Sequence, residues 1–330
     1  MALSTPEELE AAFRESERAG AVGPGTARRR LLPESQLDVF AEVRFPKHEW
    51  VLVVEGGERL DDGDLLLAAG LHCRVRNGSV EVVATQDTDR RLFCTLLADL
   101  VRQLAIPSPA PATALLRRLT SWRRMLGQGL VTGLGPEARI GLYGELLVLR
   151  ELLLPVLGNH AVRSWAGPSG GAQDFIHGSV AVEVKTVSQR NGEQCRINSE
   201  RQLDSVGLTD LFLVHQVLAG NPEGTSLSDL VDALRETPAV GMDRAWFENC
   251  LLEAGWLDTH REQYVNDRYV LVRRRCLAVT DGFPRMTAAQ LPSGVSGVSY
   301  LIDLAACVPH RIEEAAVWSA VARAINAGEE

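Results

Sequence analysis

Two short apolar segments joined by a tight turn constrain this chain more than any other feature. Asp174 leads into the first segment, a His-Gly-Ser turn at 177–179 follows, and Glu183 and Lys185 lie on the second segment. Because residues i and i+2 of a strand point to the same face, Glu183 and Lys185 project together while the neighbouring valines pack into the core. Asp174, before the turn, can reach the same end of the sheet. The sequence therefore predicts a hairpin that gathers three charged side chains.

A solvated strand face is the alternative interpretation, since a Glu-x-Lys pair on a strand is common. The valines around Glu183 and Lys185 are typical of a buried strand, where an unpaired charge would be costly. Only two of the 34 basic residues, Lys47 and Lys185, are lysines. A chain that otherwise uses arginine keeps lysine where a compact ammonium with a shiftable pKa is needed. Two carboxylates beside an ammonium form a site for a hard divalent cation such as Mg²⁺.

Glu145 is a further candidate, on a helix that precedes this hairpin. Apolar residues lie three, four and seven positions from it, which places its carboxylate on the apolar face of the helix. Gly141 and Gly144 lower the helix propensity but allow a neighbouring element to approach closely. A core glutamate paired with an ordinary arginine is the alternative.

Five spaced motifs carry a resemblance to a known family. They are Gly144-Glu145-Leu-Leu, Trp165-x-Gly167-Pro168, Asp174-Phe175, Glu183-Val-Lys185-Thr186 and Ile197-Asn-Ser199-x-x-Gln202-Leu203. Together they resemble the PD-(D/E)XK nuclease superfamily, most closely the bacterial branch labelled "PD-(D/E)XK motif protein". Members of that branch are found near ATPase and methyltransferase genes in phage-defence or restriction-like loci. One departure is Gln173, which stands where the motif has proline.

The resemblance assigns a role to each matching residue. Asp174 and Glu183 would be metal ligands, and Glu145 would be an accessory acid that joins them at the metal. Lys185 would orient or activate the attacking water, or stabilise charge on the phosphorane. Gln202 would be the polar residue that opens the helix after the catalytic strands.

The same resemblance implies a fold and a reaction. The fold is α/β, a restriction-endonuclease-like core with a central mixed β-sheet flanked by helices. The reaction is Mg²⁺-dependent endonucleolytic cleavage of DNA by phosphodiester hydrolysis, with Mn²⁺ able to substitute. Expected partners are DNA, ATPase- or methyltransferase-type subunits of a defence complex, and a second copy of the chain in a homodimer.

Residues after Lys185 are candidates for weaker nucleic-acid contacts. Ordinary surface arginines, and a helix cap in the case of the serine, explain them as well. They are Arg190, Arg196, Ser199 and Arg201. Two arginine clusters outside the motifs, at 117–124 and 273–275, are either DNA tracks or partners of surface acids.

The charge of the chain and the missing proline before Asp174 favour one alternative function, and a second alternative uses the same site on other substrates. The formal net charge is −9 and the pI is about 5.4, whereas a protein that binds nucleic acid tightly usually has a basic surface. One alternative is therefore a catalytically inactive subunit that keeps the nuclease fold and acts through protein contacts. The other is a phosphohydrolase that acts on RNA or nucleotides with the same site.

Composition also bears on the compartment. No run approaches the roughly 18 apolar residues of a membrane span, and the N-terminal residues lack the features of a signal peptide, so a cytoplasmic protein is expected. The six cysteines are scattered without a metal-binding spacing, which predicts buried or unreactive thiols.

Three regions are expected along the chain. They are a strand-rich α+β domain at 1–106 that contacts partners or DNA, the nuclease-like core at 107–220, and a helical and β extension at 221–330 packed on that core. The proline-rich segment at 107–111 sets the first boundary.

Hydrophobic periodicity and turn residues predict the individual elements. Helices are expected at 5–19, 89–105, 113–126, 136–154, from 199 onward, and at 227–234, 242–255 and 312–325. Strands are expected at 36–45, 49–55, 71–76, 79–84, 160–165, 174–176, 180–187, 195–197 and 211–218, with a strand pair at 269–280 and 295–304. A loop is expected at 20–30, a turn at 61–64 and a hairpin at Asn77-Gly78.

Overall fold

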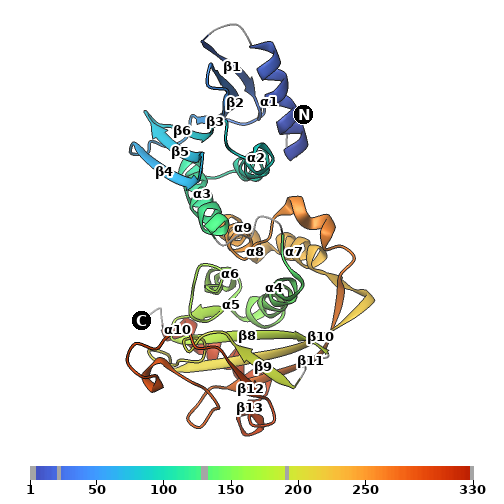
Figure 1. Ribbon diagram of the computed structural model, residues 1–330. Coiled ribbons are helices and arrows are strands. Elements are labelled where there is room, and N and C mark those ends of the chain that lie inside the picture. Colours follow the sequence, from blue (N-terminus) through green and yellow to red (C-terminus); the bar gives the residue numbers. More distant parts are fainter. Residues whose placement is uncertain (1–4, 21–23, 128–132, 190–192, 328–330) are drawn as a thin grey trace. The chain divides into compact units, whose positions relative to one another are not determined.

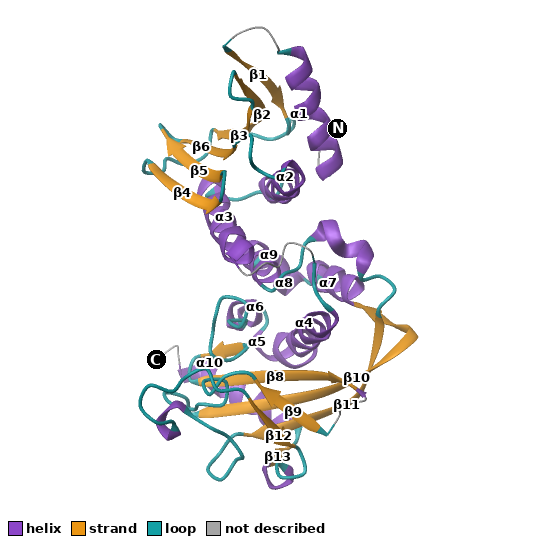
Figure 2. Ribbon diagram, in the orientation of Figure 1, coloured by secondary structure: helices purple, strands orange, loops and turns teal. Residues whose placement is uncertain are grey.

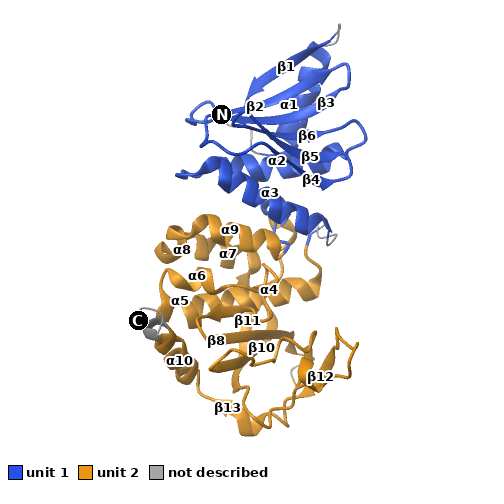
Figure 3. Ribbon diagram, turned by 90° about the vertical axis from the view of Figure 1, so that its left-hand side faces the viewer, with its two compact units in different colours: residues 1–133, 255–260 blue, residues 134–254, 261–330 orange. Residues whose placement is uncertain are grey.

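The computed structural model describes residues 5–20, 24–127, 133–189 and 193–327, and it divides into two compact units (Figure 3). Unit 1 comprises residues 1–133 and 255–260, and unit 2 comprises residues 134–254 and 261–330. This division differs from the predicted boundary at 106/107, because the helix after the proline-rich segment packs on unit 1. Its buried Arg118 contacts Asp99 with Nη2 to Oδ1 at 2.6 Å. Residues beyond 220, apart from 255–260, share a unit with the predicted core.

Unit 1 is one antiparallel sheet with three helices (Figure 1). The six strands lie in the order β1-β2-β3-β6-β5-β4. The strands are β1 (Gly25–Arg30), β2 (Asp38–Phe45), β3 (Glu49–Glu55), β4 (Gly63–Ala68), β5 (Leu71–Arg76) and β6 (Ser79–Ala84). The helices are α1 (Pro6–Ala19), α2 (Arg90–Leu104) and α3 (Pro111–Gly127).

Local sequence signals account for most of unit 1. Thr5 and Glu8 form a capping box at the start of α1. Asn77 and Gly78 have positive φ angles of 52° and 80°, which confirms the predicted hairpin between β5 and β6.

Two predictions for unit 1 are wrong. The predicted loop at 20–30 contains β1, an edge strand whose arginines pair with acids such as Glu15 and Glu42. The predicted turn at 61–64 ends inside β4, where Asp64 binds Arg76 of β5 at 2.7 Å. Both strands form by pairing with a neighbour and lack a clear alternation of their own.

Unit 2 is built on a five-stranded mixed sheet in the order β13-β11-β10-β8-β7 (Figure 2). β8 and β10 are parallel, and the other pairs are antiparallel. The strands are β7 (Phe175–His177), β8 (Val180–Ser188), β10 (Asp210–Ser226), β11 (Arg268–Ala278) and β13 (Arg311–Ile312). A separate two-stranded sheet pairs β9 (Gln194–Ile197) with β12 (Tyr300–Asp303). The predicted α/β architecture, a mixed central sheet flanked by helices, is confirmed.

The helices of unit 2 are mostly those that periodicity predicts. They are α4 (Pro136–Val148), α5 (Leu154–Leu157), α6 (His160–Ser164), α7 (Leu227–Glu236), α8 (Pro238–Met242), α9 (Arg244–Glu253) and α10 (Glu314–Ala327). A π-helical turn at Leu149–Leu153 joins α4 to α5, and 3₁₀ turns lie at Asp258–Gln263, Ala288–Gln290 and Val308–His310. The predicted helix at 136–154 is therefore a continuous helix that contains a π-helical turn near its end.

The two faces of the central sheet have different neighbours. On one face α4 packs against β8, and Gln216 of β10 donates through Nε2 to the carbonyl of Gly144 at 2.9 Å. On the other face, buried side chains of β8, β10 and β11 pack with those of β9 and β12. This cluster includes Ala181, Leu213, Leu277, Ile197 and Ile302. Glu183 and Lys185 share the strand face of Ala181.

Three predictions for unit 2 are wrong. The expected strand at 160–165 is the short helix α6, and the expected helix from Ser199 is a series of turns. The segment at 295–304 forms β12 at its end, but β12 pairs with β9, whereas β11 pairs with β10. In the case of β12, pairing with the distant β9 decides the outcome, and such pairing leaves no local pattern.

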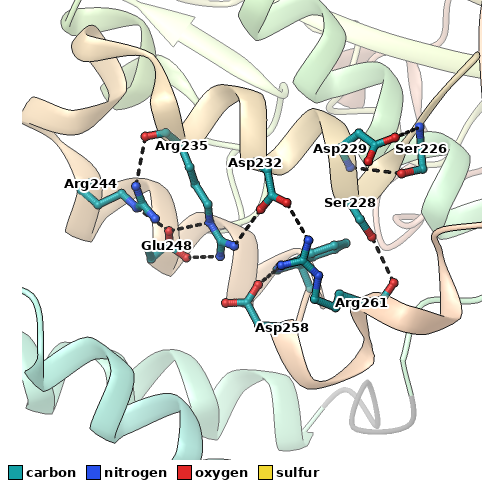
Figure 4. A network of polar contacts seen from close by, with 10 residues as sticks. Ser226, Ser228, Asp229, Asp232, Arg235, Arg244, Glu248, Asp258 and Arg261 are labelled. Atoms are coloured by element: carbon teal, nitrogen blue, oxygen red, sulfur yellow. Dashed lines mark hydrogen bonds and ion pairs between the residues drawn. The ribbon is translucent and has the colours of Figure 1, made fainter. Parts of the chain in front are cut away.

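An ion-pair network joins the helices between β10 and β11 (Figure 4). Glu248 of α9 binds Arg235 of α7 at 2.8 Å and Arg244 at 2.6 Å. Asp232 of α7 binds Arg261 at 2.6 Å. These contacts hold α7 and α9 together at one end of unit 2.

The predictions on membrane spans and thiols can be compared with the structure. Within the described ranges no helix combines the length and apolar character that a membrane crossing requires. The six cysteines are free and buried, which confirms the prediction for the thiols.

The packing of α4 on β8 leads to a testable prediction. A Cβ on Gly144 would lie 1.7 Å from Oγ1 of Thr186, whereas a Cβ on Gly141 would meet nothing within 4 Å. We expect Gly144→Ala to lower the free energy of unfolding by about 1–3 kcal/mol, because the overpacked helix must move off the sheet. Gly141→Ala, the matched control, should raise it by roughly 0.5–1 kcal/mol. Urea unfolding measures both, and equal effects would contradict the close approach.

Candidate active site

The site lies beside the first residue of β7, where β8 continues beyond its partner strand. β7 pairs with β8 only at Phe175–His177, opposite Val180–Val182. Beyond Val182 the next contact on this edge comes from a side chain, because the backbone N–H of Val184 donates to Oδ2 of Asp174 at 2.7 Å. The Asp174 carboxylate therefore continues the ladder where the strand stops, and this fixes it beside Glu183.

Glu183 and Lys185 form a buried ion pair on β8. Glu183 is 0% exposed, and Nζ of Lys185 lies 2.8 Å from its Oε1. Beyond this contact with Lys185, the carboxylate oxygens of Glu183 accept no hydrogen bond of regular geometry from the residues that the structure describes. Lys185 also donates to Oε1 of Gln202 at 3.1 Å. A buried carboxylate with open coordination is costly, so this position is suited to a further cation.

Burial raises the pKa of each carboxylate in this group. Burial and the charge of Asp174 raise the pKa of Glu183 to about 8, against the opposing effect of Lys185. Burial raises the pKa of Asp174 to about 6, although Lys185 and the Val184 N–H lower it. Burial and the charges of Asp174 and Glu183 raise the pKa of Glu145 well above its usual value. For Lys185, burial lowers the pKa, but Glu183 and Asp174 outweigh this and the pKa is raised. The site has more negative charge than one lysine balances.

Glu145 reaches this group from α4. Its Oε2 accepts a hydrogen bond from Nε1 of the buried Trp165 at 2.8 Å, and the ring of Trp165 stacks on Phe175 of β7 with centroids 6.5 Å apart. Sequence reasoning included Trp165 in a motif but gave it no role. The available signal was that a buried tryptophan requires an acceptor for its N–H.

The Trp-x-Gly-Pro motif fixes the backbone of Asp174. The N–H groups of Ala166 and Gly167 donate to the Asp174 carbonyl at 2.8 and 3.0 Å. A Cβ on Gly167 would lie 2.8 Å from Oδ1 of Asp174. Glycine at this position lets the turn approach the carboxylate.

Gln173 has a structural role that sequence reasoning missed. This buried side chain donates from Nε2 to the carbonyls of Arg201, Gln202 and Asp204 at 3.0–3.3 Å. It thereby holds the turn that carries Gln202, whose Oε1 accepts from Lys185 and from the Asn198 N–H. The residue that departs from the family pattern anchors the Gln202 turn, a role that proline, with no side-chain donor, cannot fill. Gln202 lies in this turn and does not open a helix as predicted.

The structure brings Glu145, Asp174, Glu183, Lys185 and Gln202 together but not the weaker candidates. Arg196 and Arg201 are exposed, and in the described part of the chain neither forms a hydrogen bond or ion pair with those five. Ser199 accepts from the Arg201 N–H at 3.0 Å and so caps a turn. Arg190 lies outside the described residues. Contacts of these four with nucleic acid stay a prediction.

One arginine in each of the two clusters is buried and has a structural role. Arg118 is buried against Asp99, which also accepts from Trp122 at 2.7 Å. Arg274 is 6% exposed and binds Gln216 and Glu151 on the α4 side of the sheet. These two are partners of internal acids and amides and cannot form a DNA track.

The oxygen donors of the site are those that a hard cation takes. No group of three His, Cys, Asp or Glu side chains in the described ranges has the arrangement of a metal site. Mg²⁺ needs only one or two carboxylates with waters and phosphate oxygens, so Asp174 and Glu183 suffice. Glu145 as a third ligand stays a prediction.

A comparison with models of known protein families gave a match. A family model described as "Putative PD-(D/E)XK family member, (DUF4420)" matches residues 7–305. Neither the curated proteins nor the solved structures gave a match.

The raised pKa values predict how stability depends on pH in the absence of metal. An unfolded glutamate releases its proton near its ordinary pKa of 4.5, whereas folded Glu183 keeps it until about pH 8. This contribution to stability is complete below pH 4.5 and is lost as the pH rises through about 8. At roughly 1.4 kcal/mol per pKa unit, we expect a loss of the order of a few kcal/mol between pH 5 and pH 8 in EDTA.

Glu183→Gln should remove most of this loss, as measured by urea unfolding at several pH values. Glu15→Gln, an exposed glutamate in unit 1, is the control and should leave the pH dependence unchanged. Parallel pH profiles for the wild type and Glu183→Gln would contradict the assignment.

Proposed function

Because the chain belongs to this family of PD-(D/E)XK proteins, we propose that it is a Mg²⁺-dependent DNA endonuclease of a bacterial anti-phage defence or restriction-like system. The observation that carries the proposal is the Glu183 carboxylate, which is fully buried beside Asp174 and in contact with the single ammonium of Lys185. A buried carboxylate of this kind is explained by a cation that completes its coordination.

Asp174 and Glu183 would hold the metal. Burial raises the pKa of both groups, helped by the charge of Asp174 in the case of Glu183, and carboxylate oxygens are the ligands that Mg²⁺ prefers. When bound, such an ion lowers the pKa of a coordinated water and neutralises charge on the scissile phosphate. Mn²⁺, which takes the same ligands, would substitute.

Lys185 would act on the water or the phosphate. An ammonium has three N–H donors, and Glu183 and Gln202 engage two of its directions at 2.8 and 3.1 Å. A third donor can reach an attacking water or a phosphate oxygen. Gln202 thus orients the ammonium, and its own position depends on the turn held by Gln173.

Glu145 would be the accessory acid. Its bond to Trp165 fixes one oxygen, and burial with the charges of Asp174 and Glu183 raises its pKa, which favours a role as a proton donor.

Cleavage of DNA with Mg²⁺ or Mn²⁺ tests the proposal. We expect activity in the wild type and a loss of about 100-fold or more in Asp174→Ala and Lys185→Ala, since each removes a group that acts on the reacting atoms. Lys47→Ala, which removes the only other lysine, on an exposed turn of unit 1, is the matched control and should keep full activity. Equal activity in all four proteins would refute the assignment. RNA and nucleotide substrates in the same assay separate the phosphohydrolase alternative.

The acidic net charge of −9 favours one alternative, a non-catalytic subunit that acts through protein contacts. Metal binding discriminates between the two functions. We expect calorimetry to detect Mn²⁺ binding to the wild type and to Glu15→Gln, and little or none to Asp174→Ala. An absence of binding in the wild type would support the non-catalytic subunit. In either case, an ATPase- or methyltransferase-type partner of the kind that the resemblance implies would bring this acidic chain to DNA.

A further inference from the structure

A row of basic side chains crosses the sheet from the candidate active site. In the parallel pair β8–β10, Lys185 lies opposite His215, and in the antiparallel pair β10–β11, His215 lies opposite Arg275. Residues in register on neighbouring strands point to the same face, so all three share the face of Glu183. Arg273, two residues before Arg275, lies on this face as well, while Arg274 points to the other.

Both arginines bind a single exposed carboxylate. Glu193 lies just before β9 and is 67% exposed. Its Oε1 is 2.7 Å from Nη2 of Arg273, and its Oε2 is 3.1 Å from Nη2 of Arg275. Arg273 is 39% exposed and Arg275 18%, and because exposed ion pairs contribute little to stability, an external anion can replace Glu193 at low cost, above all at Arg273.

His215, in the middle of the row, is uncharged, so the positive charge lies on Lys185 at one end and on the arginines at the other. The imidazole is 0% exposed, and within the described residues neither ring nitrogen has a hydrogen-bond partner. Burial and the charges of Arg275 and Arg273 lower its pKa to about 4, so the ring is neutral. Lys185 and the two arginines therefore supply the positive charge on this face.

We propose that Arg273 and Arg275 bind a backbone phosphate of the nucleic acid and that Glu193 occupies this position until substrate arrives. Guanidinium groups match phosphate as they match carboxylate, which makes Glu193 an internal mimic of the ligand. Two strand spacings separate β8 from β11, about 10 Å, so the bound phosphate lies within a few nucleotides of the bond at Lys185. This inference rests on the proposed function, because it requires a nucleic-acid substrate.

The arrangement reconciles an acidic chain with a nucleic-acid substrate. The backbone of Glu193 is held next to the second sheet, because the Leu304 N–H donates to its carbonyl at 3.1 Å. Its carboxylate is therefore kept close to the arginines and competes with a phosphate for them. Binding of the phosphate must displace it, which lowers affinity for nucleic acid in general and leaves a local basic site for a correctly placed strand.

Binding of a short DNA duplex to the full chain, measured by fluorescence anisotropy in EDTA, tests the inference. We expect Glu193→Gln to bind about fivefold more tightly than the wild type, the factor for one unit charge at about 4 Å in water. The double variant Arg273→Gln/Arg275→Gln should bind more weakly. Its slope of log affinity against log salt, from about 50 to 200 mM, should be smaller by about one.

Matched variants exclude an effect of overall charge. Glu15→Gln removes the same charge from an exposed ion pair with Arg29 and should change affinity far less. The gain from Glu193→Gln should disappear in the Arg273→Gln/Arg275→Gln background, because the two effects act through one site. Arg273→Gln alone, at a side chain 39% exposed, provides the readout if the double variant unfolds.

Three results overturn the inference. They are a gain from Glu193→Gln no larger than that from Glu15→Gln, an unchanged salt slope in the arginine variants, and no DNA binding by Glu193→Gln at the lowest salt. Because these measurements exclude metal, they do not depend on cleavage. A protein that cleaves DNA but fails them refutes only the phosphate site, and one that passes them without cleaving DNA refutes only the nuclease.

Discussion

Burial of Glu183 beside Lys185 is the interaction on which the organisation of unit 2 depends. A carboxylate with no exposed surface requires positive charge close by, and Lys185 supplies it at 2.8 Å. Asp174 adds a second carboxylate beside the same lysine, and burial raises the pKa of both acids, with the charge of Asp174 raising that of Glu183 further. The two carboxylates carry more negative charge, when ionised, than the single ammonium of Lys185 can balance. A bound cation, as in the proposed function, would correct that imbalance.

The surrounding elements hold this group in place without filling its coordination. Gly144 lets α4 lie against Thr186, which brings Glu145 near the strands, and Gln216 secures the helix backbone from the sheet. On the other side, Gln173 gathers three carbonyls of the turn that orients Gln202. Each contact comes from a polar side chain or a glycine inside a mostly apolar core. Rigid placement of this kind is what a catalytic site requires of its supporting residues.

Electrostatics differ between the chain as a whole and one face of its sheet. The net charge of −9 discourages general association with nucleic acid, whereas Lys185, Arg273 and Arg275 lie along one face. Glu193 neutralises the two arginines from an exposed position, so this basic surface is balanced until an anion competes for it. The net negative charge repels nucleic acid at long range, whereas the two arginines attract it locally. This combination favours a strand that is delivered to the site or correctly positioned there over one captured at random.

The sequence by itself determined what depends on neighbouring residues. Alternation placed Glu183 and Lys185 on one face, the His-Gly-Ser turn brought Asp174 to them, and helical periodicity placed Glu145 on an apolar face. Only the tertiary structure decided that Trp165 binds Glu145, that β9 pairs with β12, and that Gln202 lies in a turn. These features join segments far apart in the chain, so local periodicity carries no signal for them. The lysine shared by two buried carboxylates likewise became visible only when burial and register were known.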